Sequence, residues 1–157
     1  MALFRDFEAR AAERSIPKYY WRFEASDAML GSAMRSLVSI VDDDESVRES
    51  LPDLLRELGF AVQPFSSAED FLASDYLDKT DCLILDIAMP GMTGPELQLE
   101  MSHRPHQTPI IFITAQSDES ERQRLLDRGA VACLHKPFAE AELLQALNSA
   151  LGSNTSE

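Results

Sequence analysis

The chain contains the stretch LVSIVDDDE at residues 37–45, in which a short apolar run ends at consecutive carboxylates. Four more short apolar runs follow, and stretches with the apolar spacing of helices separate them. The five runs are residues 37–41, 60–62, 82–85, 110–113 and 131–134. Their apolar residues are contiguous rather than alternating, so most of these strands should be buried on both faces. This order predicts a three-layer, doubly wound α/β domain with a five-stranded parallel sheet.

The segments between the runs carry helix start and stop signals. Residues 66–69 (SSAE) fit a capping box that begins a short helix, and residues 93–96 (TGPE) are typical of the start of the next one. Gly59 and Gly129 are placed to end the helices that precede them. Asp44 is better explained as an N-terminal helix residue than as a ligand.

The composition excludes several classes of function. The net charge is −13, with 27 acidic and 14 basic residues, so no surplus of Lys and Arg is available to neutralise a nucleic acid. The longest apolar run has five residues, and the N-terminal residues lack the apolar core of a secretory signal. We therefore expect a cytoplasmic protein without a membrane span. Cys82 and Cys133 lack metal-ligand spacing and fit buried packing positions.

Charge and aromatic content divide the chain into an extension at residues 1–33, a domain at 34–151 and a polar tail at 152–157. Residues 1–33 hold five basic and five acidic residues, whereas the rest holds 9 basic and 22 acidic. The extension also holds six of the twelve aromatic residues, which suggests a partly helical segment that docks on the domain, on a second copy in a homodimer or on another partner. Alternatively, it lies upstream of the natural start, because Met29 and Met34 are plausible starts.

Polar side chains follow four of the five predicted strands. Asp42 and Asp43 follow the first strand, Asp86 the third, Thr114 the fourth and Lys136 the fifth. In a doubly wound sheet, ligands bind outside the carboxyl ends of the strands. Clustered carboxylates suit Mg²⁺, and Lys together with the metal can neutralise a phosphoryl group. Without a cation the carboxylates would repel one another, and one should hold a proton.

Four strings together resemble the receiver domain of bacterial two-component response regulators, with closest likeness to the FixJ-like group. They are residues 40–48 (IVDDDESVR), 83–94 (LILDIAMPGMTG), 111–115 (IFITA) and 136–138 (KPF). The resemblance covers about residues 36–151. It implies a flavodoxin-like sheet with strand order 2-1-3-4-5.

The resemblance also implies roles for the acidic residues. Asp86 would be the phosphoacceptor, taking a phosphoryl group from a phosphohistidine of a sensor histidine kinase or phosphotransfer protein. Asp42, Asp43 and Asp86, with the backbone carbonyl of Ala88, would bind Mg²⁺ or Mn²⁺. The domain would then be a signalling switch rather than an enzyme of metabolism.

Four further positions follow from the same resemblance. Thr114 and Lys136 would hold the phosphoryl oxygens, and Pro137 would follow the lysine through a cis peptide bond in a rigid turn. The family has an aromatic switch residue three positions before the lysine, but this chain has Cys133 there. The usual readout of phosphorylation is therefore in doubt.

Two other functions are compatible with parts of the sequence. An aspartate-nucleophile phosphatase also uses an Asp at a strand end with Mg²⁺ and Lys, but it needs a second Asp where this chain has Ala88. An interaction module that no longer uses phosphate would agree with Cys133 and the aromatic extension. The complete set of site residues favours the receiver, whose output partner the sequence does not identify.

Overall fold

The computed structural model describes residues 35–116 and 118–152. The extension at residues 1–33, with its predicted helix and aromatic cluster, lies outside the described residues, and so does the tail from residue 153. The predictions made for these two segments are therefore untested by the fold.

The described residues form a five-stranded sheet in the order β2-β1-β3-β4-β5, and every neighbouring pair is parallel. The strands are β1 (Leu37–Val41), β2 (Ala61–Phe65), β3 (Cys82–Asp86), β4 (Ile110–Thr114) and β5 (Ala132–His135). This confirms the predicted fold class and strand order. Because all strands run the same way, their carboxyl ends meet at one edge of the sheet.

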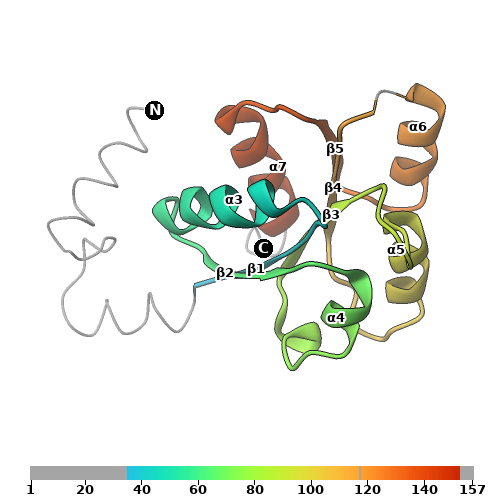
Figure 1. The fold of residues 1–157 in the computed structure, drawn as a ribbon, viewed down its shortest axis with the longest axis horizontal. Helices are drawn as coiled ribbons and strands as arrows, with labels where there is room; N and C mark the ends of the chain where they lie inside the picture. Colours follow the sequence, from blue (N-terminus) through green and yellow to red (C-terminus); the bar gives the residue numbers. More distant parts are fainter. Residues whose placement is uncertain (1–34, 117, 153–157) are drawn as a thin grey trace, which may run out of the picture.

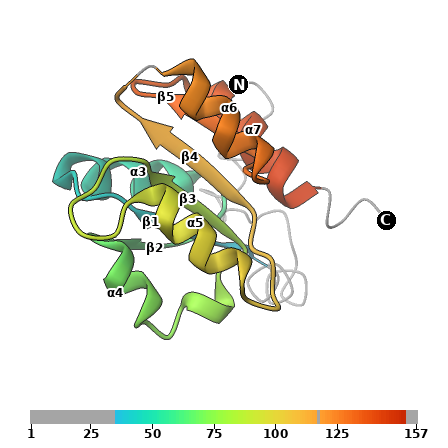
Figure 2. The ribbon, with the colours of Figure 1, turned by 90° about the vertical axis from the view of Figure 1, so that its right-hand side faces the viewer.

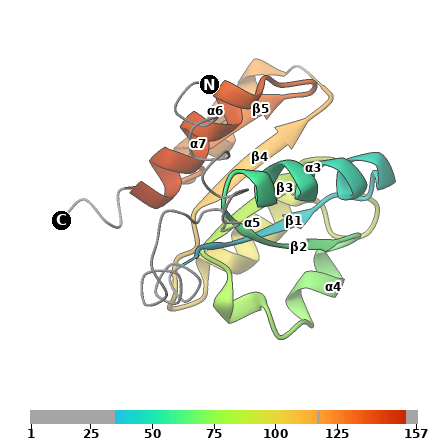
Figure 3. The same ribbon diagram turned by 90° about the vertical axis from the view of Figure 1, so that its left-hand side faces the viewer.

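Helices cover both faces of the sheet, which gives three layers (Figure 1). The helices are α3 (Glu45–Glu57), α4 (Ala68–Leu72), the 3-10 turn η1 (Leu77–Lys79), α5 (Gly94–Ser102), α6 (Glu119–Asp127) and α7 (Glu140–Gly152). Helices α4, α5 and α6 lie on one face (Figure 2), and α3 and α7 lie on the other (Figure 3). Right-handed crossovers between parallel strands produce this arrangement.

The two faces of the sheet have separate hydrophobic clusters. Leu55 of α3 and Leu143 of α7 pack with Ile40 on one face, while Phe71 of α4 and Leu97 of α5 pack with other strand residues on the opposite face. Every residue of β3 and β4 is buried, as the contiguous apolar runs predict, whereas the edge strands β2 and β5 are only partly buried. The buried central strands therefore hold in place the edge of the sheet where the polar side chains lie together.

Strand β2 runs further than its apolar residues predict. The sequence places a strand at residues 60–62, but β2 is Ala61–Phe65 and includes Pro64. Proline has no N–H to donate to a neighbouring strand, so it is tolerated where one side of the strand is unpaired. Strand β2 is an edge strand, which explains how the pairing with β1 continues through Pro64 to Phe65.

The capping box predicted at residues 66–69 is displaced by one residue. Ser67, not Ser66, is the N-cap of α4, and its hydroxyl accepts the backbone N–H of Asp70 at 3.0 Å. Glu69 is thus in the first turn of the helix and does not bond back to the cap. The helix start predicted at residues 93–96 is confirmed, and the structure shows a capping box there in which Thr93 and Glu96 bond reciprocally. Asp44 is the N-cap of α3, as predicted.

Both cysteines are buried and unbridged, as expected of packing residues. Burial raises the pKa of the Cys82 thiol to about 12, so it stays protonated. Among the helices of the described residues, none has both the length and the apolar character needed to cross a bilayer.

Candidate functional site

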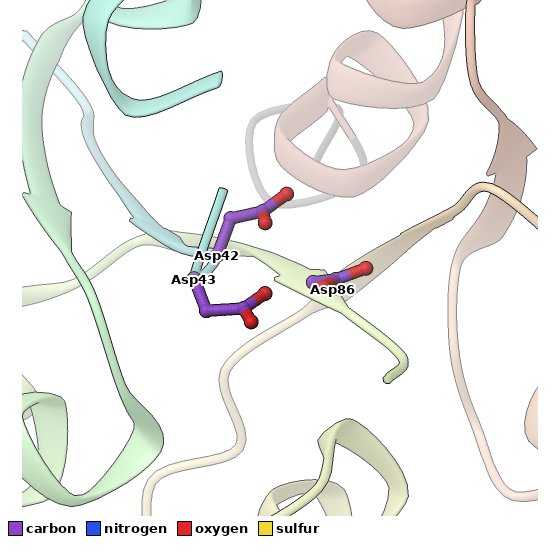
Figure 4. Close-up of side chains that lie close together, drawn as sticks. All are labelled: Asp42, Asp43 and Asp86. Atoms are coloured by element: carbon purple, nitrogen blue, oxygen red, sulfur yellow. The ribbon is translucent and has the colours of Figure 1, made fainter. Parts of the chain in front are cut away.

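Three carboxylates meet at the carboxyl edge of the sheet (Figure 4). Asp42 and Asp43 follow the last residue of β1, and Asp86 is the last residue of β3. One oxygen from each lies within 4.8 Å of the others. Strands β1 and β3 are direct neighbours in the sheet, which explains why residues more than forty positions apart in the chain form one cluster.

Asp42 is fully buried and its carboxylate is held from two sides. One oxygen accepts the backbone N–H of Asp44 at 2.9 Å, and the other accepts the Lys136 ammonium at 2.9 Å. The backbone of Asp42 is fixed as well, because its carbonyl accepts the Arg48 guanidinium and its N–H bonds to the Phe65 carbonyl of β2. A buried charge requires such partners, so Asp42 has a single well-defined position. Asp43, by contrast, is exposed at the rim.

Asp86 lies in an environment that disfavours its charged form. Its residue surface is only 6% exposed, and burial, followed by the nearby charge of Asp42, raises the pKa of Asp86 to about 7. Lys136 opposes this shift and Asp43 adds to it. The expectation that one carboxyl of the cluster holds a proton in the absence of a cation thus agrees with the local electrostatics.

Lys136 provides the positive charge of the site. Its ammonium lies 2.9 Å from an Asp42 oxygen and 3.7 Å from an Asp86 oxygen. Burial lowers the pKa of Lys136, but the hydrogen bond and charge of Asp42, with smaller contributions from Asp86 and Asp44, outweigh burial and raise the pKa above its ordinary value. The side chain therefore stays protonated and lies between two acidic residues.

The loop after β3 passes close to the end of the same strand. Ala88 is exposed in this loop, directly beyond the buried Ile87. Where the loop ends, the Gly94 N–H bonds to the Ile87 carbonyl at 3.0 Å. A Cβ at Gly94 would clash with the Asp86 backbone oxygen, so only glycine permits this approach. The return of the loop on itself fixes the backbone on both sides of Ala88.

Thr114, Cys133 and Pro137 lie around the site without joining the carboxylate cluster. Thr114 is buried at the end of β4, and its hydroxyl accepts the Gln116 N–H at 3.0 Å. Cys133 is buried in β5 beside Phe112 of β4, and burial raises the pKa of its thiol. The Lys136–Pro137 peptide bond is cis, in agreement with the implication of the resemblance.

Sequence reasoning missed some contacts that shape the site. The bond from Arg48 to the Asp42 carbonyl joins the first helix to the site, and the Glu69 carboxylate accepts a bond from the loop after β3. The sequence offers one signal for the contact between Arg48 and the Asp42 carbonyl: the helical spacing puts Arg48 one turn into α3. No local pattern indicates the second one. His103 and His106 are exposed, as expected of histidines in a loop.

The donor set suits a hard divalent cation. The carboxylate oxygens of the cluster lie within a few ångströms of one another, and such oxygen ligands are what Mg²⁺ takes in proteins. A divalent charge would also offset the burial and the repulsion from Asp42 that together raise the pKa of Asp86. The residues present therefore fit the ion that the sequence analysis expects.

Comparison with known families assigns the fold. The family model described as the response regulator receiver domain matches residues 38–148, which cover the five strands except the first residue of β1, and most of α7. The chain belongs to this family. The receiver domain is a signalling domain of two-component systems, as the sequence resemblance indicates.

Relatives and solved structures agree with this assignment. Nodulation protein W of Bradyrhizobium diazoefficiens is 38% identical over 85% of this chain and 58% of its own length. The transcriptional regulatory protein TdiR of Thauera aromatica is 40% identical over 76% of this chain and 52% of its own length. The chain thus spans little more than half of these relatives.

Among solved structures, the receiver domain is similar to the response regulator StyR, with TM-score 0.70 and 43% identity over 76% of this chain and 61% of that one. It is also similar to FixJ-N, with TM-score 0.68 and 35% identity over 76% of this chain and 95% of that one.

Proposed function

We propose that this receiver domain accepts a phosphoryl group on Asp86 from a phosphohistidine of a sensor histidine kinase or phosphotransfer protein. The observation that carries the proposal is the convergence of Asp42, Asp43, Asp86 and Lys136 at one edge of the sheet. Phosphorylation would change the affinity of the domain for an output partner. The relatives named as transcriptional regulators support a regulatory output for the longer proteins.

The transfer requires a charged carboxylate and charge neutralisation. An Asp86 oxygen forms the new O–P bond while the N–P bond of the phosphohistidine breaks, and the imidazole leaves with the electron pair. Mg²⁺, or Mn²⁺, would be held by the carboxylates of Asp42, Asp43 and Asp86 and the Ala88 carbonyl, and it supplies positive charge for the phosphoryl oxygens.

The residues around Asp86 have separate tasks in this proposal. Asp43 is exposed and would meet the cation directly, whereas Asp42 also orients Lys136 through a 2.9 Å bond. Lys136 would pair with a phosphoryl oxygen, for which its position 3.7 Å from Asp86 is suited. Thr114 would donate its hydroxyl hydrogen to the phosphoryl group, which the bond that its oxygen accepts from Gln116 does not prevent.

The domain organisation is also a proposal. The extent of the family match supports a receiver domain at residues 34–151, preceded by an extension at 1–33 and followed by a tail at 152–157. Helix α7 ends at Gly152, one residue into the proposed tail.

The test is intact-mass measurement after incubation with acetyl phosphate and Mg²⁺. We expect one phosphate adduct on the wild type, and none on Asp86→Asn or when the metal is chelated. Phosphate release is measured in parallel, so that rapid turnover is not mistaken for inactivity. If neither an adduct nor release occurs, the phosphate-independent interaction module becomes the better explanation. An adduct retained on Asp86→Asn would mean that another residue is the acceptor.

A further inference from the structure

The side chain of Glu69 links helix α4 to the loop that follows Asp86. Its Oε2 accepts the backbone N–H of Met92 at 2.9 Å, across 23 residues of sequence. Glu69 lies in the first turn of α4, and its side chain is exposed at the surface. A bond between a side chain and a distant backbone amide positions the loop relative to the helix rather than stabilising the helix itself.

The absence of a Cβ at Gly91 leaves room for the Glu69 side chain. Its φ is +74°, a conformation that residues with a Cβ rarely adopt. A Cβ built at Gly91 would lie 2.8 Å from Glu69 Oε2, and the three nearest heavy atoms all belong to the Glu69 carboxyl group. The glycine therefore leaves the space that the carboxylate occupies, and the same oxygen, Oε2, accepts the Met92 N–H.

The remaining anchors of the loop lie elsewhere. The N–H of Ile87 bonds to the Ile113 carbonyl, and the Gly94 N–H bonds to the Ile87 carbonyl, so both ends are held by backbone bonds. Met89 is buried in the same hydrophobic cluster as Phe71 of α4. Between these anchors, the Glu69 carboxylate is the polar contact that holds the Gly91–Met92 turn against α4.

We propose that Glu69 is a positioning residue for the cation site. By holding residues 91–92 against α4, it restricts the loop that carries Ala88, whose backbone carbonyl is a ligand in the function proposed above. This inference rests on that function. A ligand supplied by a backbone carbonyl needs a fixed loop, because its position depends on the backbone dihedrals of its neighbours rather than on a rotamer.

The first experiment measures Mg²⁺ affinity by isothermal titration calorimetry, together with the initial rate of adduct formation from acetyl phosphate. Glu69→Ala should weaken Mg²⁺ binding by about tenfold. Glu69→Gln should stay within about twofold of the wild type, because an amide oxygen can still accept the Met92 N–H. Asp70→Ala is the matched control, since it removes an exposed carboxylate from the same helix turn without touching the loop, and it should bind Mg²⁺ like the wild type.

A double-mutant cycle with Gly91→Ala tests the same contact from the side of the loop. Gly91→Ala should weaken Mg²⁺ binding, and combining it with Glu69→Ala should give a smaller loss than the product of the two single effects. The reason is that the three heavy atoms nearest to the added methyl group all belong to the Glu69 carboxyl group. Circular dichroism before titration confirms that each variant is folded. Should Glu69→Ala fail to fold, Gly91→Ala, which displaces the same carboxylate, takes its place in the comparison with Glu69→Gln and Asp70→Ala.

The outcomes separate the inference from the proposed function. If the wild type binds Mg²⁺ and forms the adduct while Glu69→Ala matches Asp70→Ala, the positioning role is wrong and the phosphoacceptor function stands. Equal losses in Glu69→Gln and Glu69→Ala would also contradict it, because charge rather than the hydrogen bond would then matter. If the wild type neither binds Mg²⁺ nor forms the adduct, both proposals fail.

Discussion

The raised pKa of Asp86 makes the stability of the metal-free domain depend on pH. Asp86 has an ordinary pKa of 3.8 and one of about 7 in the folded protein, because of burial first and of the Asp42 charge second. Between these two values the folded state binds a proton that the unfolded chain releases. The free energy of unfolding should therefore fall as pH rises from about 4 to about 7 and level off above that.

The magnitude follows from the two pKa values. At about 1.4 kcal/mol for each tenfold change in proton affinity, the full difference corresponds to about 4 kcal/mol. The cluster lies at the rim of the sheet, where water and salt screen the charges, so we expect about half of this, or about 2 kcal/mol. Asp86→Asn removes the charge at almost constant volume. It should therefore exceed the wild type in stability by about 2 kcal/mol at pH 8 and by almost nothing near pH 4.

The assay is urea unfolding followed by circular dichroism between pH 4 and 8, with a chelator present. Asp75→Asn serves as the control, because it removes an exposed carboxylate. Its stability relative to the wild type should change little with pH. Added Mg²⁺ should stabilise the wild type more than Asp86→Asn at pH 8. The difference in the free energy of unfolding between the two proteins should therefore become smaller. An advantage of Asp86→Asn that is the same at pH 4 and pH 8 would refute this account of the site's electrostatics.

Two further substitutions test contacts of the same site. Lys136→Met leaves the Asp42 carboxylate buried without its 2.9 Å partner, so we expect a loss of about 3 kcal/mol in the free energy of unfolding at pH 7. Lys136→Arg, which keeps the charge, should lose less, and equal losses would mean that packing rather than charge is responsible. Gly94→Ala should lose about 2 kcal/mol in the free energy of unfolding although alanine favours helices, because its Cβ would clash with the Asp86 backbone oxygen. Thermal melting measures this loss, and a stabilised Gly94→Ala would show that the loop moves aside at little cost.

The sheet could be predicted because its signal is local and repeated. Strands β3 and β4 each begin with a run of four apolar residues, and this pattern identified both strands to within one residue. The ends of β2 were harder to place, because Gln63 and Pro64 interrupt the apolar pattern while the pairing with β1 continues. Edge strands have one unpaired side, so their composition is less constrained than that of central strands.

The N-terminus of α4 shows how two local patterns can compete. Residues 66–69 contain Ser followed three positions later by Glu, and the overlapping pair Ser67 and Asp70 has the same spacing. The structure uses the second pair, with the Ser67 hydroxyl bound to the Asp70 N–H. Nothing in the local sequence distinguishes the two registers. The choice agrees with the packing of Ala68 and Phe71, both fully buried under the helix.

The choice of Ser67 rather than Ser66 as the N-cap of α4 affects a contact near the site that the sequence did not predict, whereas the gathering of the site's charged residues was predicted. Parallel strands bring their carboxyl ends to one edge wherever they lie in the sequence, so a rule of topology collects Asp42, Asp86 and Lys136. No such rule relates the side chain of a helix to a loop. Had Ser66 been the cap, Glu69 would have bonded back to its own helix terminus, as Glu96 does in α5. Because the cap is Ser67, the Glu69 carboxylate reaches Met92 instead, and only the folded chain reveals that contact.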